Sequence, residues 1–158
     1  MAFTFRKGIS ADHIKQLIKY SNDKNDISIF KYTSDQTRFA NQKSFDQWFK
    51  QGRTIYTASE GKNLIGIIWF GSKPIPVDNY SHDTTFAIRI YPKARGKGVS
   101  FSFMDYAFKN YQPKNVWLEC SADNTPAVKL YTKFSFHQVT SPDKNNKIIM
   151  VLDNKNGH

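Results

Sequence analysis

The sequence predicts a protein of the α/β (α+β) class, in which a mixed central sheet is flanked by helices on both faces. Two observations predict this class. The patterned segments follow one another as one strand, two helices, three strands, and then helix and strand in alternation with a closing strand. The chain also has 158 residues, enough for one domain with a single sizeable core. We therefore expect one domain over residues 1–152 and a frayed polar tail over residues 153–158.

The first segments are a short strand and two helices. Residues 3–6 predict the strand, and Ser10 is a predicted N-cap for the helix that follows. Ser44 and Gln47 have the spacing of a capping box, which predicts a second helix from Ser44 to Gly52. Residues 22–41 between these helices are polar and predict no element. The inward face of the first helix would carry Ile14, Leu17 and Ile18.

Strands dominate the rest of the chain. Thr54–Ser59 and Leu64–Phe70 are predicted strands, and the four residues between them, which include Gly61, suit a hairpin turn. A long loop with two prolines follows over Gly71–His82. The later predicted elements are a strand at Thr84–Ile90, a helix at Val99–Lys109, a strand at Val116–Cys120, a helix from Thr125, and strands at Phe136–Thr140 and Lys147–Leu152.

The segment Tyr91–Phe101 has the composition of a phosphate-binding loop. It is basic, and it joins a predicted strand to a predicted helix. A loop that enters a helix leaves several backbone amides without partners inside the helix, and Gly96 and Gly98 allow close approach of a ligand. The glycine spacing does not fit a P-loop. A dinucleotide fingerprint would need a third glycine where Phe101 stands.

Two sequence blocks resemble the GNAT N-acetyltransferase family. Residues 95–100, Arg-Gly-Lys-Gly-Val-Ser, fit its acetyl-CoA loop Arg/Gln-x-x-Gly-x-Gly/Ala, with Ser100 departing at the last position. Residues 124–136 resemble the family pattern Asn-x-x-Ala-x-x-Leu-Tyr-x-Lys-x-Gly-Phe. Ser135 departs there from a glycine at the helix C-terminus, where positive φ is expected. The matching positions of the second block are Asn124, Ala127, Leu130, Tyr131, Lys133 and Phe136.

The resemblance implies a fold, a co-substrate and a reaction. The fold would be the acyl-CoA N-acyltransferase fold, with a mostly antiparallel central sheet. Acetyl-CoA would donate its acetyl group to an amine of a small molecule or peptide, by direct attack in a ternary complex. The family's general acid matches Tyr131, whose phenol can protonate a thiolate leaving group. Asn124 would bind the cofactor or cap the helix, or do both. The other residues that the resemblance assigns to the cofactor are Ile88 and Ile90, through backbone groups, and Arg95, Gly96, Lys97, Gly98, Val99 and Ser100.

The general base and the acceptor amine are left open by the sequence. Glu119, Asp83 and His82 could each relay an amine proton through water. The lone Cys120 has no neighbouring histidine, so we expect a small buried side chain rather than a nucleophile. The resemblance places the acceptor groove in three weakly patterned segments, residues 27–49, 71–82 and 141–147.

Composition limits the remaining possibilities. One cysteine and four scattered histidines predict no metal site. The longest apolar run is too short to span a bilayer, so we expect a soluble, cytoplasmic protein. The net charge of +10 keeps a second hypothesis open, a non-catalytic acyl-CoA-binding or nucleic-acid-associated module. Because the lysines are spread along the chain, a solvated surface is favoured over a nucleic-acid site. A homodimer is left open.

Overall fold

The structure, a computed structural model, describes residues 2–33 and 35–153. These residues group into two compact units, which are treated separately below. The first contains the chain up to Trp69 and the segment Ile88–Val99. The second contains Phe70–Ala87 and the chain from Ser100 onward. A single domain over residues 1–152 therefore stays a prediction.

Seven strands pair in the order β1-β2-β3-β4-β5-β7-β6. The pairs β1–β2, β5–β7 and β6–β7 are antiparallel, whereas β4 and β5 are parallel. The sheet is thus mixed and mostly antiparallel, which confirms the predicted class. The strands are β1 (Thr4–Lys7), β2 (Thr54–Glu60), β3 (Asn63–Ser72), β4 (Thr84–Ile90), β5 (Val116–Ser121), β6 (His137–Gln138) and β7 (Lys147–Leu152).

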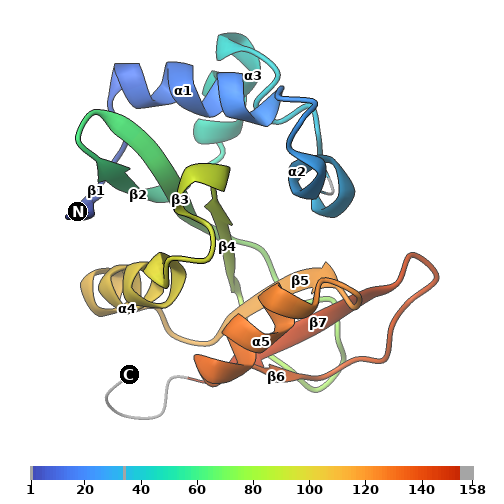
Figure 1. Ribbon diagram of the computed structural model, residues 1–158. Helices are drawn as coiled ribbons and strands as arrows, with labels where there is room; N and C mark the ends of the chain where they lie inside the picture. The colour runs from blue at the N-terminus through green and yellow to red at the C-terminus, as the bar shows by residue number, and fades with distance from the viewer. Residues whose placement is uncertain (1, 34, 154–158) are drawn as a thin grey trace. The chain divides into compact units, whose positions relative to one another are not determined.

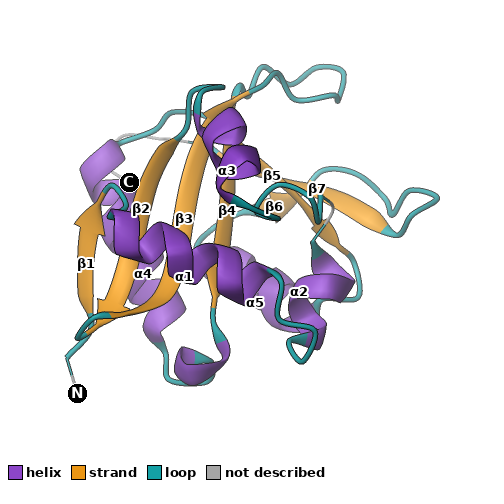
Figure 2. Ribbon diagram, turned by 90° about the horizontal axis from the view of Figure 1, so that it is seen from above, coloured by secondary structure: helices purple, strands orange, loops and turns teal. Residues whose placement is uncertain are grey.

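The first unit has helices α1 (Ala11–Ser21), α2 (Ile27–Tyr32) and α3 (Gln42–Phe49). Helices α1 and α3 lie next to each other in Figure 1, and Figure 2 shows β1, β2 and β3 side by side. As predicted, the Ser10 hydroxyl caps α1 by accepting a hydrogen bond from the amide of His13 at 3.1 Å. Leu17 on this helix is fully buried. His13, which the predicted apolar face omitted, is also buried.

Two helices of the first unit differ from the prediction. Helix α3 begins at Gln42 rather than Ser44, because Asn41 is its cap and accepts a hydrogen bond from the Ser44 amide at 2.9 Å. It ends at Phe49, before the expected Gly52. Helix α2 lies in the polar stretch for which no element was predicted. It has six residues and no side-chain cap bond, so it left little signal in the sequence.

The core of the first unit is aromatic. Trp48 on α3 and Trp69 on β3 meet edge to face with ring centroids 5.3 Å apart. Phe39 meets both rings in the same way, at 4.8 and 5.6 Å. Edge-to-face pairs of this kind contribute about 0.5 to 1.5 kcal/mol each beyond their burial. The cluster therefore holds α3 and the α2–α3 connection on the sheet.

The second unit contains α4 (Val99–Tyr111), whose first residue belongs to the first unit, and α5 (Thr125–Lys133). Figure 1 shows β5, β7 and β6 side by side. Phe86 on β4 packs against Phe108 of α4 and against Phe136, which follows α5. A second apolar cluster has Trp117 at its centre, with Ile75, Ile149 and Val151 around it. Both clusters tie β4 and β5 to their neighbours.

The C-terminal region shows one confirmed prediction and two corrections. Ser135 has φ +83°, so the serine does adopt the left-handed conformation expected after α5. Strand β6 covers only His137–Gln138, because the Phe136 amide donates to the Tyr131 carbonyl of α5 and the Ile149 amide donates to the Thr140 hydroxyl instead of a backbone carbonyl. Asp153 is not frayed, since it contacts His82. The rest of the predicted tail, residues 154–158, lies outside the described residues.

Candidate active site

The predicted phosphate loop is open, and two of its residues adopt backbone conformations that favour glycine. A 3-10 turn, η1 (Pro92–Ala94), follows β4, and α4 begins at Val99. Gly96 and Gly98 have φ of +76° and +72°, values that favour glycine, and no atom lies within 4 Å of where a Cβ would stand on either. Within the described part of the chain, the amides of Gly96, Lys97 and Gly98 donate no hydrogen bond. The loop therefore presents free donors where a helix begins.

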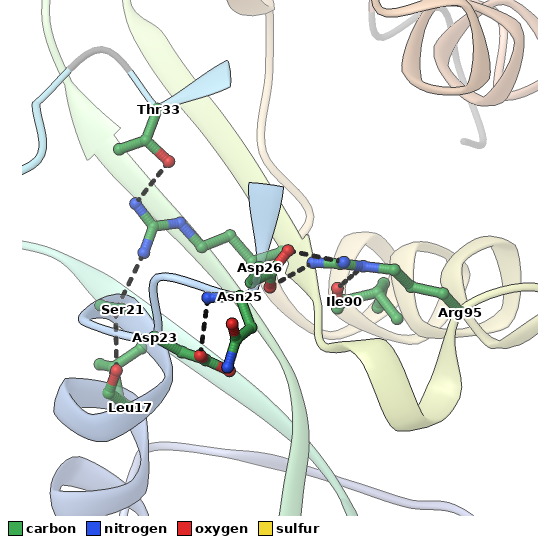
Figure 3. A network of polar contacts seen from close by, with 9 residues as sticks. Leu17, Ser21, Asp23, Asn25, Asp26, Thr33, Ile90 and Arg95 are labelled. Atoms are coloured by element: carbon green, nitrogen blue, oxygen red, sulfur yellow. Dashed lines mark hydrogen bonds and ion pairs between the residues drawn. The ribbon is translucent and has the colours of Figure 1, made fainter. Parts of the chain in front are cut away.

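Arg95 does not lie as the sequence suggested. The resemblance assigned Arg95 to the cofactor, but its guanidinium makes two hydrogen bonds of 2.8 Å to Asp26, which precedes α2 (Figure 3). The Asp26 side chain is 2% exposed, and that of Arg95 is 35% exposed. The Arg95 amide donates to the Pro92 carbonyl. Arg95 thus positions the loop, and the free amides begin at Gly96.

The remaining cofactor residues of this segment differ in exposure. Lys97 is exposed, Val99 is buried at the start of α4, and Ser100 is partly buried in its first turn. Ile88 and Ile90 are half-buried on β4. The Ile90 carbonyl accepts a 2.7 Å hydrogen bond from Arg95 Nε, so one of its two lone pairs is already used.

Tyr131 is buried on α5 in the second unit and is 8% exposed. Its ring lies edge to face with Phe86 at 6.3 Å and contacts Phe136 at 5.9 Å. No hydrogen bond reaches its hydroxyl from any residue that the structure describes. Burial raises the pKa of the phenol above its ordinary value, and the neighbouring Cys120 raises it further. The phenol therefore stays protonated at neutral pH and can donate a proton.

The structure narrows the possible roles of Asn124 and Cys120. Asn124 occupies the N-cap position of α5, but its side chain makes no capping hydrogen bond. The capping alternative is therefore wrong for this side chain, although Pro126 does lie in the first turn, as expected. Cys120 is partly exposed, and burial raises the pKa of its thiol to about 11. A thiol of that pKa is almost entirely protonated at neutral pH and makes a poor nucleophile.

The three candidate bases lie at different places in the second unit. His82 is buried and its Nε2 is 2.7 Å from Asp153 Oδ1, whereas Asp83 is exposed. Both precede Thr84, which pairs with Val116 at the start of β5. Cys120, which interacts electrostatically with Tyr131, is four residues further along β5, about 13 Å at 3.3 Å per residue.

Glu119, the third candidate, is exposed on β5. Because successive side chains of a strand alternate between its faces, Glu119 lies on the opposite face from Cys120. Glu119 therefore faces away from Tyr131, whereas His82 and Asp83 lie near the other end of β5.

Comparison with known proteins identifies the family. The sequence pattern of the Acetyltransferase (GNAT) family matches residues 6–136, which include both blocks described above. The chain belongs to the GNAT family. A curated relative, mycothiol acetyltransferase of Renibacterium salmoninarum, is 27% identical over 106 residues, or 64% of this chain. The chain spans only 31% of that relative's length.

Solved structures share the GNAT fold. The ribosomal-protein-alanine N-acetyltransferase of Brucella melitensis matches with a TM-score of 0.74 and 16% identity, over 95% of this chain and 99% of the other. The spermidine N-acetyltransferase of Vibrio cholerae, solved with CoA and spermine, matches with a TM-score of 0.68 and 17% identity. That match covers 94% of this chain and 92% of the other. These likenesses concern the fold, in agreement with the predicted acyl-CoA N-acyltransferase architecture.

Two other kinds of site are absent from residues 2–33 and 35–153. No group of three or more histidine, cysteine, aspartate or glutamate side chains there could hold a metal ion. None of the described helices is both long enough and apolar enough to cross a membrane.

Sequence reasoning missed two polar contacts. The Asp26–Arg95 pair joins residues 69 apart in sequence, and the His82–Asp153 pair joins residues 71 apart. No local pattern could have indicated either of them. Arg89 did give a signal, because a charged residue between Ile88 and Ile90 is unusual in an apolar strand.

Proposed function

We propose that this GNAT protein transfers the acetyl group of acetyl-CoA to a primary amine. The observation that carries the proposal is the loop after β4, with two positive-φ glycines and three free amides before α4, in a chain of this family. Backbone amides at a helix N-terminus bind phosphate groups, and acetyl-CoA carries a pyrophosphate. Open space above Gly96 and Gly98 leaves room for it.

Other groups would hold the rest of the cofactor. Backbone groups of Ile88 and Ile90 would pair with the pantetheine amides. For Ile90 this requires the second lone pair of its carbonyl, because Arg95 uses the first. The side chain of Asn124, which makes no capping bond, is available to the cofactor. Arg95 contributes by holding the loop through Asp26 rather than by contacting phosphate.

The proposed reaction is a direct transfer in a ternary complex. The neutral amine attacks the thioester carbonyl carbon, a C–N bond forms, and the C–S bond breaks. The amine loses a proton to water or to a base, and the departing thiolate takes a proton from the Tyr131 hydroxyl. Burial raises the pKa of this phenol, which keeps it protonated at neutral pH but also makes it a weaker acid, so its proton must pass to the sulfur as the C–S bond breaks, and the phenolate then regains a proton from solvent. Such chemistry needs an acid, a base and binding energy, and it uses no metal.

The proposal also includes an acceptor, a cellular location and an oligomeric state. The acceptor is an amine of a small molecule or peptide. A cytoplasmic location is proposed because acetyl-CoA is an intracellular metabolite. A homodimer is a further prediction, which light scattering at the assay concentration would check.

The test is an acetyl-transfer assay with a panel of amines that includes polyamines, aminoglycosides and peptides with free N-termini. Release of the CoA thiol and the mass of the acetylated amine are measured together. Thermal stabilisation by acetyl-CoA, but not by DNA or RNA, is expected in parallel. Acetyl-CoA binding without turnover of any amine would instead support the non-catalytic alternative.

A further inference from the structure

Arg89 on β4 is a charged residue whose partners are all neutral. Its guanidinium donates to the hydroxyl of Ser21 at 3.2 Å and to that of Thr33 at 3.3 Å. Figure 3 shows these two hydroxyls, from the last turn of α1 and the end of α2. The guanidinium also lies 5.1 Å from the centroid of Phe39 and 5.5 Å from that of Trp69. It forms no ion pair with any described residue.

A second arginine, Arg38, stacks on the same two aromatic rings. The Arg38 guanidinium lies 5.3 Å from the centroid of Trp69 and 6.0 Å from that of Phe39. Its Nε is buried and has no hydrogen-bond partner among the described residues. Burial lowers the pKa of Arg38, and repulsion by Arg89 lowers it further. An unpaired buried donor in an arginine is an unusual and costly arrangement.

The carboxylates near Arg38 do not balance the positive charge of the arginines around it. Arg53 adds a third positive charge close enough to repel Arg38, and Asp35 is the carboxylate that attracts it. The Asp35 carboxylate already accepts hydrogen bonds from the amide and hydroxyl of Thr37. Among the described residues, two guanidinium groups therefore repel Arg38 and one carboxylate attracts it, so positive charge predominates around it. The same unit contains a contrast, since Arg95 is fully paired with Asp26.

A small recess opens beside Arg89. Its volume, about 10 Å³, is room for a single water-sized polar group rather than a whole substrate. The donors that the lining offers to an anion are the Arg89 guanidinium and the Thr33 hydroxyl, because the Ser21 hydroxyl already donates to the Leu17 carbonyl. The Asp35 carboxylate also lines the recess, whereas Arg38 does not. Its residues are Ser21, Ile29, Thr33, Asp35, Phe39 and Arg89, together with Gln36.

We propose that Arg89 forms a subsite for one oxygen of an anionic group, a carboxylate or a phosphate, carried by the acceptor amine, and that Arg38, stacked on the same two rings, adds positive charge beside it. This inference rests on the proposed function. In that proposal the loop amides bind the pyrophosphate of acetyl-CoA, and the recess, which other residues line, is left for the acceptor. An anion in the recess would supply the missing negative charge. Guanidinium groups bind carboxylate and phosphate through paired donors, and stacking on aromatic rings fixes their orientation. The acceptor would thus be an amino acid, a peptide or a phosphorylated amine rather than a polyamine.

The first experiment needs no enzyme activity. Melting temperatures are measured in acetate, in inorganic phosphate and in chloride at equal ionic strength. One or both of the first two anions should raise the melting temperature of the parent by a few degrees over chloride. Arg89→Gln and Arg38→Gln should abolish the rise in acetate and reduce the rise in phosphate, part of which would come from the loop amides, whereas Arg6→Gln, on the exposed face of β1, should keep both. Because the Arg38 side chain makes no hydrogen bond with a described residue, its variant should fold even if Arg89→Gln does not.

The second experiment compares amines that differ by one anionic group. Tyrosine is paired with tyramine, and phosphoethanolamine with ethanolamine, and kcat/KM is measured for acetylation of each. The preferred anionic amine should exceed its neutral partner by about 10- to 100-fold, the usual contribution of a charged hydrogen bond. Arg89→Gln and Arg38→Gln should reduce that ratio toward one. Preference for the carboxylate pair or the phosphate pair tells which anion the site takes.

The outcomes separate this inference from the proposed function. No thermal response to either anion, or an equal preference in parent and variants, overturns the anion subsite. A tenfold loss of acetyl-CoA affinity in Arg89→Gln also overturns it, because the arginines would then serve the cofactor. A thermal response that depends on Arg38 and Arg89, with no acetylation of any amine, sustains the subsite and overturns the proposed activity.

Discussion

At the scale of single residues, Tyr131 is the most direct test of the proposed chemistry. Tyr131→Phe removes only a hydroxyl that has no hydrogen-bond partner among the described residues and keeps the ring contacts with Phe86 and Phe136. Stability and acetyl-CoA affinity should therefore change little. The kcat value should fall by about a hundredfold to ten-thousandfold, the usual contribution of positioned acid catalysis. An unchanged kcat, with chemistry shown to limit the rate, would return Tyr131 to a core role.

Arg95 leads to a different prediction, because its partner is buried. Arg95→Ala leaves the Asp26 carboxylate without its cation, so the free energy of unfolding should fall by about 2 to 3 kcal/mol. This is below the loss for a fully buried pair because the Arg95 side chain is 35% exposed. Urea unfolding measures the change. The matched control is Lys97→Ala in the same loop, which should stay within about 0.5 kcal/mol of the parent. A double variant with Asp26→Asn should lose less than the sum of the two single losses, and strict additivity would contradict the coupling.

At the scale of elements, the loop before α4 can be tested against a second glycine of the same geometry. Gly98 and Gly61 both have positive φ, +72° and +59°, and neither has an atom within 4 Å of its missing Cβ. Valine should cost about 1 to 2 kcal/mol of strain at either place. Only Gly98→Val should put its side chain in the path of the pyrophosphate, so calorimetry should show a severe loss of acetyl-CoA affinity for that variant alone. Equal affinities in the two variants would remove the loop from the cofactor site.

Helix α5 offers a prediction of the opposite sign. Ser135 follows its C-terminus at φ +83°, a conformation that glycine adopts with little cost. Ser135→Gly should raise the free energy of unfolding by about 0.5 to 1 kcal/mol, as measured by thermal or urea unfolding. Ser135→Ala keeps the strained conformation and should bring no gain. A stabilised alanine variant would show that the hydroxyl, not the backbone, is unfavourable.

Local sequence predicted the bounds of some helices and strands and missed others. The bounds of β4 and β7 follow from apolar β-branched runs ended by proline, turn residues or charge. Helix α2 escaped prediction because it is six residues long and has no side-chain cap bond. The start of α3 was wrong because Asn41 and Ser44 are both good caps, and only the folded chain shows which one accepts the hydrogen bond.

At the scale of the whole molecule, the sequence predicted the sheet class and the position of the cofactor loop, but not the partners of its charged residues. Arg95 was assigned to the cofactor, and no neighbouring residue indicated its carboxylate partner, which comes from a segment 69 residues earlier. Asp153 was expected in a frayed tail and instead reaches His82. Motifs capture backbone demands such as positive φ in the loop, which are local. Ion pairs between distant segments depend on tertiary packing, which no short pattern contains.

The net charge of +10 is the remaining property of the whole chain that needs an explanation. The Arg95–Asp26 and Lys109–Asp105 ion pairs contribute nothing to this net charge, which rests on other basic residues, among them the arginines stacked over Trp69. Exposed lysines occur on β1, α1 and α3 and in the β6–β7 connection, with no continuous basic run. We therefore expect only non-specific binding to duplex DNA or RNA, with Kd weaker than about 1 µM at physiological salt and a log-linear loss of affinity as salt rises. Fluorescence anisotropy across a salt series measures this, with acetylation assayed in the same buffers. A sub-micromolar complex that persists at physiological salt, or an acetylation rate that responds to added nucleic acid, would make nucleic acid a specific partner.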